Sequence, residues 1–220
     1  MIYIHKEREP EKLLAYRKTE FADYDHMPTE VKDAVRESLM KEQGNICAYC
    51  MRRLEVDKTT IEHIIPRNPR EQEKDTKLSL DYKNMLAVCK GNTGAPFPQT
   101  TCDKHRGNTS LTITPLNSRL IEQIAYKTDG TIYSEHTEIQ KDLDKTLNLN
   151  CSAVSLPECR KNALDALKKQ LQQEKKQGNW TKEMLQKYKM KIEERSDGNY
   201  IPYLGILLWY LDDKIKKVHK

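Results

Sequence analysis

The sequence predicts an α+β fold in which a small core of two short strands lies between helical segments. Residues 61–66 and 86–89 carry the branched apolar side chains that are typical of strands. Before and after this region, apolar residues recur at helical spacing. Cysteine pairs bracket the two predicted strands. With 220 residues, the chain is long enough to bury one core together with a helical lobe.

The cysteines have the most constrained spacing in the sequence. Cys47 and Cys50 are separated by two residues, as in zinc knuckles, where a tight turn brings two thiolates to one ion. Cys89 and Cys102 complete a set of four, with a loop rich in glycine and proline between them. We therefore expect a structural zinc site. The alternatives are small buried apolar residues or a redox pair.

Two polar residues, Glu62 and His63, stand inside the first predicted strand. Their burial without partners would cost several kcal/mol, so they need a ligand or hydrogen-bonding groups. Strand alternation points them to opposite faces. One of them can then hold a metal while the other acts on a nucleophile, and the alternative is a structural pair whose hydrogen bonds are satisfied.

A family resemblance follows from the order of these motifs. The stretches EQGNICAYC, IEHIIPR, LDYKNMLAVC and CDKHRGN, with the opening MIYIHK, resemble the PtuB family of HNH effectors in Septu and retron anti-phage systems. The motifs cover residues 45–110, with a looser similarity at 147–150 and in the last third of the chain. The resemblance implies a ββα-metal (His-Me finger) HNH core with a four-cysteine zinc staple, N-terminal helices and a C-terminal helical lobe.

The same resemblance implies roles for single residues. His63 would be the general base that activates water, and Asn84 would hold the loop that orients it. Glu62 and His105 would bind the catalytic ion, Mg²⁺ or Mn²⁺, and Asp103 is an alternative to His105.

The formal net charge of +5 is mild and does not by itself identify a nucleic-acid-binding protein. The placement of the basic residues is more informative. Six of them fall within or beside the predicted site, and each is expected to neutralise a phosphate, which would make binding depend steeply on salt. They are Arg52, Arg53, Arg67, Arg70, Lys104 and Arg106.

We divide the chain into four segments. Residues 1–44 are expected to be helical, 45–110 to form the nuclease core, 111–150 to form an accessory hairpin and connector, and 151–220 to form a helical lobe suited to partner docking. Helices are predicted at about 157–177, 180–195 and 201–210. The apolar stretch 201–211 is about half the roughly 20 residues that cross a membrane, so no membrane association and a cytoplasmic location are expected.

The resulting hypothesis is a metal-dependent HNH endonuclease that cleaves phosphodiester bonds, preferably in DNA, as the effector of an anti-phage system. The resemblance also implies control by a PtuA-type ATPase. The alternatives are a nuclease that cleaves tRNA in a retron system, a zinc-stapled nucleic-acid or protein binding module without catalysis, and a toxin-like nuclease that acts without a partner.

Overall fold

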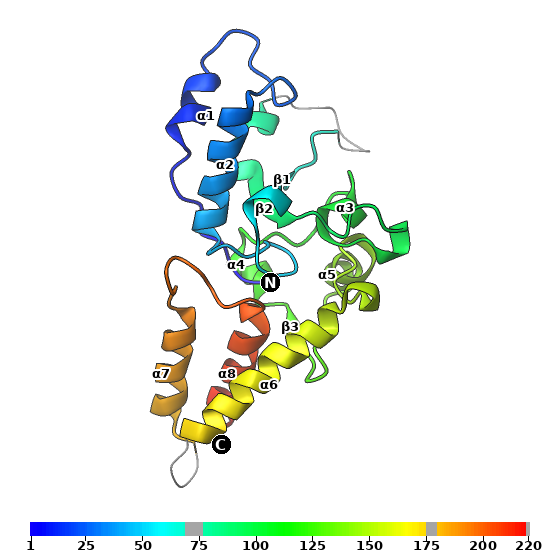
Figure 1. The fold of residues 1–220 in the computed structure, drawn as a ribbon. Coiled ribbons are helices and arrows are strands. Elements are labelled where there is room, and N and C mark those ends of the chain that lie inside the picture. The colour runs from blue at the N-terminus through cyan, green and yellow to red at the C-terminus, as the bar shows by residue number, and fades with distance from the viewer. Residues whose placement is uncertain (69–76, 175–179, 219–220) are drawn as a thin grey trace.

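The computed structural model describes residues 1–68, 77–174 and 180–218. Two helices near the N-terminus, α1 (Glu11–Tyr16) and α2 (Thr29–Glu42), lie at one end of the elongated molecule (Figure 1). Three C-terminal helices lie at the other end. The strands β1 (Thr59–His63) and β2 (Met85–Cys89) lie between the two ends with the short helix α3 (Cys102–Arg106). The predicted α+β class is confirmed.

Helix α2 lies in the segment predicted to be helical and begins after Pro28, because a proline fits the start of a helix, where no backbone donor is needed. Val31, Val35 and Leu39 are buried and form the stripe that packs on the strands. Gly44 follows the helix with φ of 61°, and a Cβ there would collide with the ring of Tyr200 at 2.3 Å. The turn therefore requires glycine and sends the chain into the first cysteine pair.

The two strands form an antiparallel hairpin in which Thr59 faces Cys89 and His63 faces Met85. All of β2 is buried. The sequence predicts that the first strand runs to residue 66, but β1 ends at His63. Beyond it, the backbone of Ile65 is held by the side chain of Asn84 instead of by a strand partner.

Residues 111–150 contain the predicted hairpin, formed by β3 (Ala125–Tyr126) and β4 (Ile132–Tyr133). They also contain two helices that the sequence did not indicate, α4 (Ser118–Ile121) and α5 (Thr137–Lys141). Helix α5 continues into a π-helical turn, Asp142–Thr146. The Asp142 carboxylate accepts the backbone N–H groups of Thr112 and Ile113 at 2.6 and 3.0 Å, so a tertiary contact holds this turn.

The C-terminal lobe consists of α6 (Leu156–Glu174), α7 (Lys182–Glu193) and α8 (Leu204–Lys217). Helix α8 extends seven residues beyond the predicted end at 210, and it packs against α6, α7 and β3. Its Gly205 allows close approach to the core, because a Cβ there would lie 2.7 Å from Met51 Cε and from the Tyr126 hydroxyl. No helix in the described ranges is long and apolar enough to cross a membrane.

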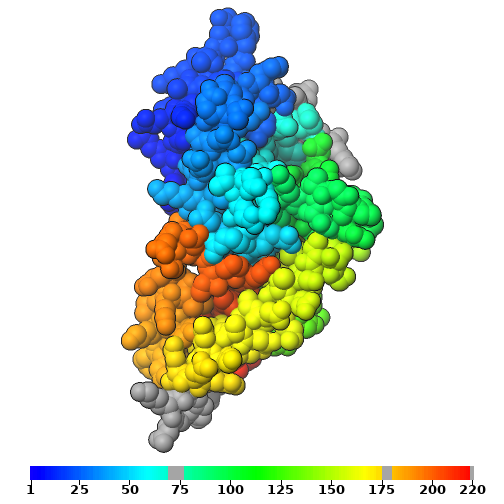
Figure 2. All heavy atoms as spheres, viewed as in Figure 1, coloured from blue at the N-terminus to red at the C-terminus, as the bar shows by residue number. Residues whose placement is uncertain are grey.

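The segment between α7 and α8 contacts the end of α2, as the space-filling view shows (Figure 2). Arg195 donates to the carbonyls of Lys41 and Glu42 at 2.7 and 2.6 Å. The backbone N–H of Tyr200 donates to the Gly44 carbonyl at 2.9 Å. The lobe is thereby joined to the turn that leads into the cysteine motif.

Candidate active site

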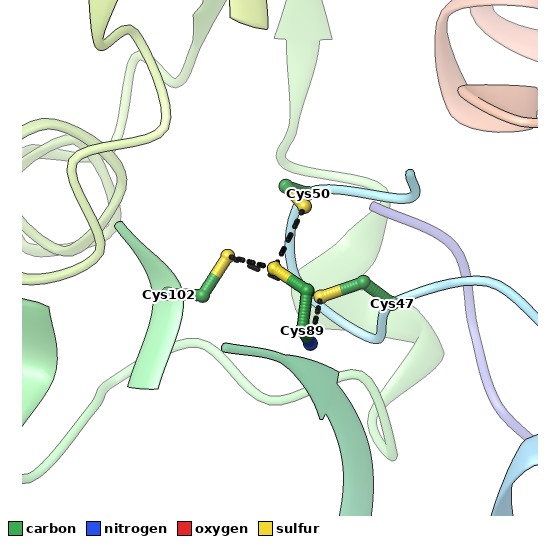
Figure 3. Close-up of side chains that lie close together, drawn as sticks. All are labelled: Cys47, Cys50, Cys89 and Cys102. Atoms are coloured by element: carbon green, nitrogen blue, oxygen red, sulfur yellow. Dashed lines mark hydrogen bonds between the residues drawn. The ribbon is translucent and has the colours of Figure 1, made fainter. Parts of the chain in front are cut away.

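Four sulfur atoms converge in the centre of the core (Figure 3). Cys47 and Cys50 come from the turn after α2, Cys89 ends β2, and Cys102 begins α3. All four are buried, and their sulfurs lie within 4.8 Å of one another. None of them forms a disulfide.

The spacing of the sulfurs suits a tetrahedral metal ion. The distances are 3.9 Å for Cys47–Cys102 and 3.7 Å for both Cys50–Cys89 and Cys89–Cys102. A tetrahedron with Zn–S bonds of about 2.3 Å has edges of about 3.8 Å. Four thiolates around a divalent ion carry net negative charge, and a basic residue, Arg52, lies beside them. Burial lowers the Arg52 pKa, but the charges of the nearby cysteines raise it by more.

Glu62 is buried at the end of β1, 6% exposed. Its Oε1 accepts from the Tyr49 hydroxyl at 3.0 Å and forms an ion pair with Arg106, while Oε2 accepts the His63 backbone N–H at 3.2 Å. Burial raises the pKa of Glu62, Arg106 opposes this effect and Asp103 adds to it, and together they bring the pKa to about 8. A further cation beside this carboxyl, in addition to Arg106, would favour its ionised form.

Asp103 and His105 lie on the same short helix but contact different groups. The Asp103 carboxyl raises the Glu62 pKa, so the two acids lie near each other. The His105 ring stacks on Phe97 with centroids 4.2 Å apart, and its Nδ1 lies 3.1 Å from Thr100 Oγ1 and from the Phe97 carbonyl. The structure therefore brings Asp103 to Glu62 and turns the His105 ring toward the loop before α3.

His63 is buried, 5% exposed, and its protonation is set by its neighbours. Nε2 lies 2.9 Å from the carbonyl of Ser79, which only accepts, so Nε2 carries the proton. Nδ1 then has a free lone pair, and no described residue hydrogen-bonds to it. Burial lowers the pKa of His63 to about 4, which keeps the imidazole neutral at physiological pH.

Asn84 connects the segments on both sides of His63. Its Oδ1 accepts from Ile65 N at 2.8 Å, and its Nδ2 donates to the carbonyls of Ile65 and Leu78 at 3.1 and 3.0 Å. Leu78 directly precedes Ser79, whose carbonyl holds the imidazole. All the polar groups of this amide are used within the protein, which fits a role in positioning and leaves none for a ligand.

The six basic residues differ in what they offer a phosphate. Arg106 is only 2% exposed and donates to Glu62, Tyr49, and the carbonyls of His63, Ile64 and Thr109. The expectation that it contacts phosphate does not fit this placement, because a buried guanidinium with these acceptors is unavailable to a surface ligand.

Among the other five, Arg53 is also largely engaged with the protein. It donates to the carbonyls of Gly44, Asn45 and Tyr200 and to Asn199 Oδ1. Lys104 is exposed on α3, Arg67 lies four residues after His63, and Arg70 lies outside the described residues.

Three residues at this site were not singled out from the sequence. Tyr49 lies inside the first cysteine motif and donates to Glu62. Ser79 holds His63 through its backbone carbonyl, a group that every residue has and that leaves no sequence signal. Tyr24 comes from the segment between α1 and α2, and its ring meets that of His63 edge-on, with centroids 4.6 Å apart. No local pattern links Tyr24 to a residue 39 positions away, because only the tertiary fold brings them together.

Comparison with known proteins gives one distant similarity of interest. No family model matches the chain. A relative from Vibrio cholerae serotype O1 biovar El Tor is 29% identical over 102 residues, which are 46% of this chain and 47% of the relative. The chain thus spans about half the length of this curated relative. The relative is named as an HNH endonuclease of retron Vc95, and the name marks this activity as inferred, not demonstrated. The similarity supports an HNH endonuclease and does not distinguish the PtuB family.

Proposed function

We propose that this protein is a metal-dependent endonuclease of the HNH type that hydrolyses phosphodiester bonds of nucleic acid. The observation that carries the proposal is a neutral imidazole, His63, whose Nδ1 has no described partner, next in the chain to the Glu62 carboxyl, which has Asp103 as a neighbour. The hairpin β1–β2 followed by α3 supplies the ββα order that an HNH core requires. The similarity to the retron-associated relative supports the same conclusion.

In this mechanism His63 is the general base. Its Nδ1 accepts a proton from the water that attacks the phosphorus, while the Ser79 carbonyl holds Nε2–H and fixes the ring. Asn84 bonds to Leu78, the residue before Ser79, and to Ile65, two residues after His63. It thereby holds together the two segments that flank the imidazole. A lowered pKa suits this role because the base is unprotonated at neutral pH before the reaction starts.

Glu62 and Asp103 are the residues that would hold a divalent ion. Their fit rests on donor chemistry, since Mg²⁺ is usually bound by one or two carboxylates, with water and substrate phosphate completing its shell. When bound, the ion supplies positive charge to the non-bridging and leaving oxygens of the phosphodiester. Of the two ligands considered for α3, we favour Asp103, because the His105 ring faces Phe97 and Thr100. We assign the four cysteines to structural zinc.

The test is the variant His63→Ala in the full chain. We expect its cleavage of plasmid DNA in Mg²⁺ to fall by about 10²- to 10⁴-fold, as for loss of a general base. Zinc content and the far-UV circular dichroism spectrum should be unchanged. His136→Ala, an exposed histidine before α5, is the matched control and should retain full activity. Wild-type cleavage rates in His63→Ala at normal zinc content would contradict the proposal.

The substrate and the biological role form the finer part of the proposal. We propose DNA as the substrate, in a PtuB-type anti-phage effector that acts in the cytoplasm under the control of a PtuA-type ATPase. Support comes from the motif resemblance and from the retron named in the relative. Incubation with plasmid and with total tRNA, each in Mg²⁺ and in EDTA, separates the DNA hypothesis from the tRNA alternative. Expression of the chain without a partner tests the toxin-like alternative, which predicts cell death.

One observation favours the second candidate, a zinc-stapled binding module without catalysis. Glu62 is already paired with Arg106 and Tyr49 inside the protein, as in a structural ion pair whose needs are satisfied. This candidate predicts that Mg²⁺ does not bind and that His63→Ala leaves nucleic-acid or protein binding unchanged. Calorimetric titration of the wild-type protein with Mg²⁺ separates the two.

A further inference from the structure

The segment between α1 and α2 places an aromatic residue directly against the proposed general base. The ring of Tyr24 lies at 84° to that of His63, with 4.6 Å between centroids. This edge-to-face arrangement is the favourable one for two aromatic rings. The contact joins residues from separate parts of the core, so it restrains the imidazole in addition to its hydrogen bond with Ser79.

The segment that carries Tyr24 is held by its own hydrogen bonds. The Tyr16 hydroxyl donates to the Asp23 carbonyl at 2.8 Å and accepts the Asp23 N–H at 3.3 Å. On the other side of Tyr24, Met27 is buried and its N–H donates to the Tyr24 carbonyl at 3.4 Å. Tyr24 is therefore anchored from both directions along the chain.

Tyr24 also supports Arg67, a basic residue four positions after His63. The Arg67 guanidinium lies over the Tyr24 ring, 4.5 Å from its centroid, and Nη1 pairs with Asp25. Arg67 Nε and Nη2 hydrogen-bond to no described residue. A guanidinium stacked on a ring and held at one nitrogen is oriented in advance, and its remaining N–H groups suit the paired oxygens of a phosphate. Asp25 is exposed, so its carboxylate orients Arg67 while solvent screens its charge.

We propose that Tyr24 is a positioning residue of the nuclease site. Its ring fixes the His63 imidazole and carries Arg67, so that Arg67 offers its free N–H groups to the phosphodiester that the His63-activated water attacks. The inference rests on the proposed function and extends it to residues outside the hairpin and α3. It assigns the role to the ring of Tyr24, since no described residue hydrogen-bonds to the hydroxyl.

The test uses the full chain, a labelled DNA oligonucleotide and single-turnover kinetics, which separate the rate at saturation from the affinity. We expect Tyr24→Ala to lower the saturated rate by about 10- to 100-fold, since small misplacements of catalytic groups have effects of this size. Tyr24→Phe keeps the ring and should have a rate within about threefold of wild type. If the hydroxyl were the functional group, Tyr24→Phe would be as slow as Tyr24→Ala. If Tyr24→Ala unfolds, Tyr24→Leu replaces it, because leucine fills space without an aromatic face.

Arg67 has a separate readout in the binding step. In a His63→Ala background, which binds without cutting, Arg67→Ala should weaken DNA binding and lower the slope of log affinity against log salt by about one. Arg195→Ala is the matched control. Arg195 also stacks on a tyrosine, Tyr200 at 4.6 Å, but donates to protein carbonyls, so its loss should leave the salt slope unchanged.

Three results would overturn the inference. They are a wild-type rate in Tyr24→Ala, an equal loss of rate in Tyr24→Phe, and an unchanged salt slope in Arg67→Ala. Tyr133→Ala is the control for general effects of removing a tyrosine, because its ring lies near Lys127 in the accessory hairpin. If the wild-type protein cuts DNA and His63→Ala does not, these results leave the proposed function standing. If the wild-type protein cuts no nucleic acid at normal zinc content, the proposed function itself fails.

Discussion

The cysteine cluster and the acidic-histidine site share the hairpin β1–β2 and helix α3 but have opposite chemistry. Strand β2 ends at Cys89 and β1 ends at Glu62 and His63, so the hairpin contributes to one site at each end. Helix α3 begins with Cys102 and ends with Arg106, and it spans both. The cluster offers four buried thiols of one kind, whereas the second site combines two acids, a neutral imidazole and a buried guanidinium.

The comparison shows why one site suits structure and the other suits reaction. Four protein ligands complete the shell of a zinc ion and leave no position for substrate. Two carboxylates leave most positions of a magnesium ion to water and phosphate. The closed site therefore holds the hairpin and α3 in place, and the open site uses the rigidity that this provides.

The largest effect is expected when the closed site, the four-cysteine cluster, loses its metal. Structural zinc sites in zinc-finger peptides have apparent binding free energies of about 10–16 kcal/mol. We therefore expect Cys102→Ser, or strong chelation, to remove zinc and unfold the region around the hairpin. Metal analysis and thermal unfolding provide the measurements.

Cys159→Ser is the matched control, since this thiol is only half-buried and lies on α6. It should leave zinc content and melting temperature unchanged. A Cys102→Ser protein that melts like wild type would show that the cluster does not hold the core together.

An intermediate effect is expected at the open site, where Asp103→Asn and His105→Ala compare the two candidate ligands on α3. Asp103→Asn removes a charged oxygen beside Glu62. Loss of a group that only supports a ligand weakens metal binding by up to about 100-fold, so loss of a direct ligand should weaken Mn²⁺ binding by more than this. His105→Ala should change it by less than about tenfold, because this ring faces Phe97. Calorimetry provides both values, and the reverse order would assign the ion to His105.

The smallest expected effect is on the pH dependence of stability. In the unfolded chain the imidazole binds a proton below pH 6.5, but burial keeps His63 neutral in the folded state down to about pH 4. The unfolded state therefore binds more protons in this window, and the free energy of unfolding decreases as the pH falls, by about 1.4 kcal/mol per unit at most.

Urea unfolding at pH 7 and pH 5 measures this effect. His63→Asn lacks the titrating group, so its stability should depend less on pH than that of wild type. Both proteins share the acid sensitivity of the cysteines, so the difference between their pH dependences of stability reports on His63 alone. Identical pH dependence in both would mean that the folded state does not keep the imidazole neutral.

The local elements were largely predictable because each has a short-range cause. The helical character of the N-terminal segment and the accessory hairpin within residues 111–150 were confirmed. The convergence of the four cysteines was confirmed as well, since their spacing has few other uses. Helices α4 and α5 were missed because both are short. The π-helical turn after α5 is also held by a bond between Asp142 and the distant residue Thr112, which no local pattern reveals.

The sequence by itself determined the ligand types, the strand order and the position of an acid and a histidine within the first strand. Only the tertiary structure decided which nitrogen of His63 is free, that Asp103 and not His105 approaches Glu62, and that Arg106 is buried. It also brought Tyr24 to the site. The physical reason is that residue type fixes which bonds a group can form, whereas burial and distance, which arise from the whole fold, fix which of those bonds are made.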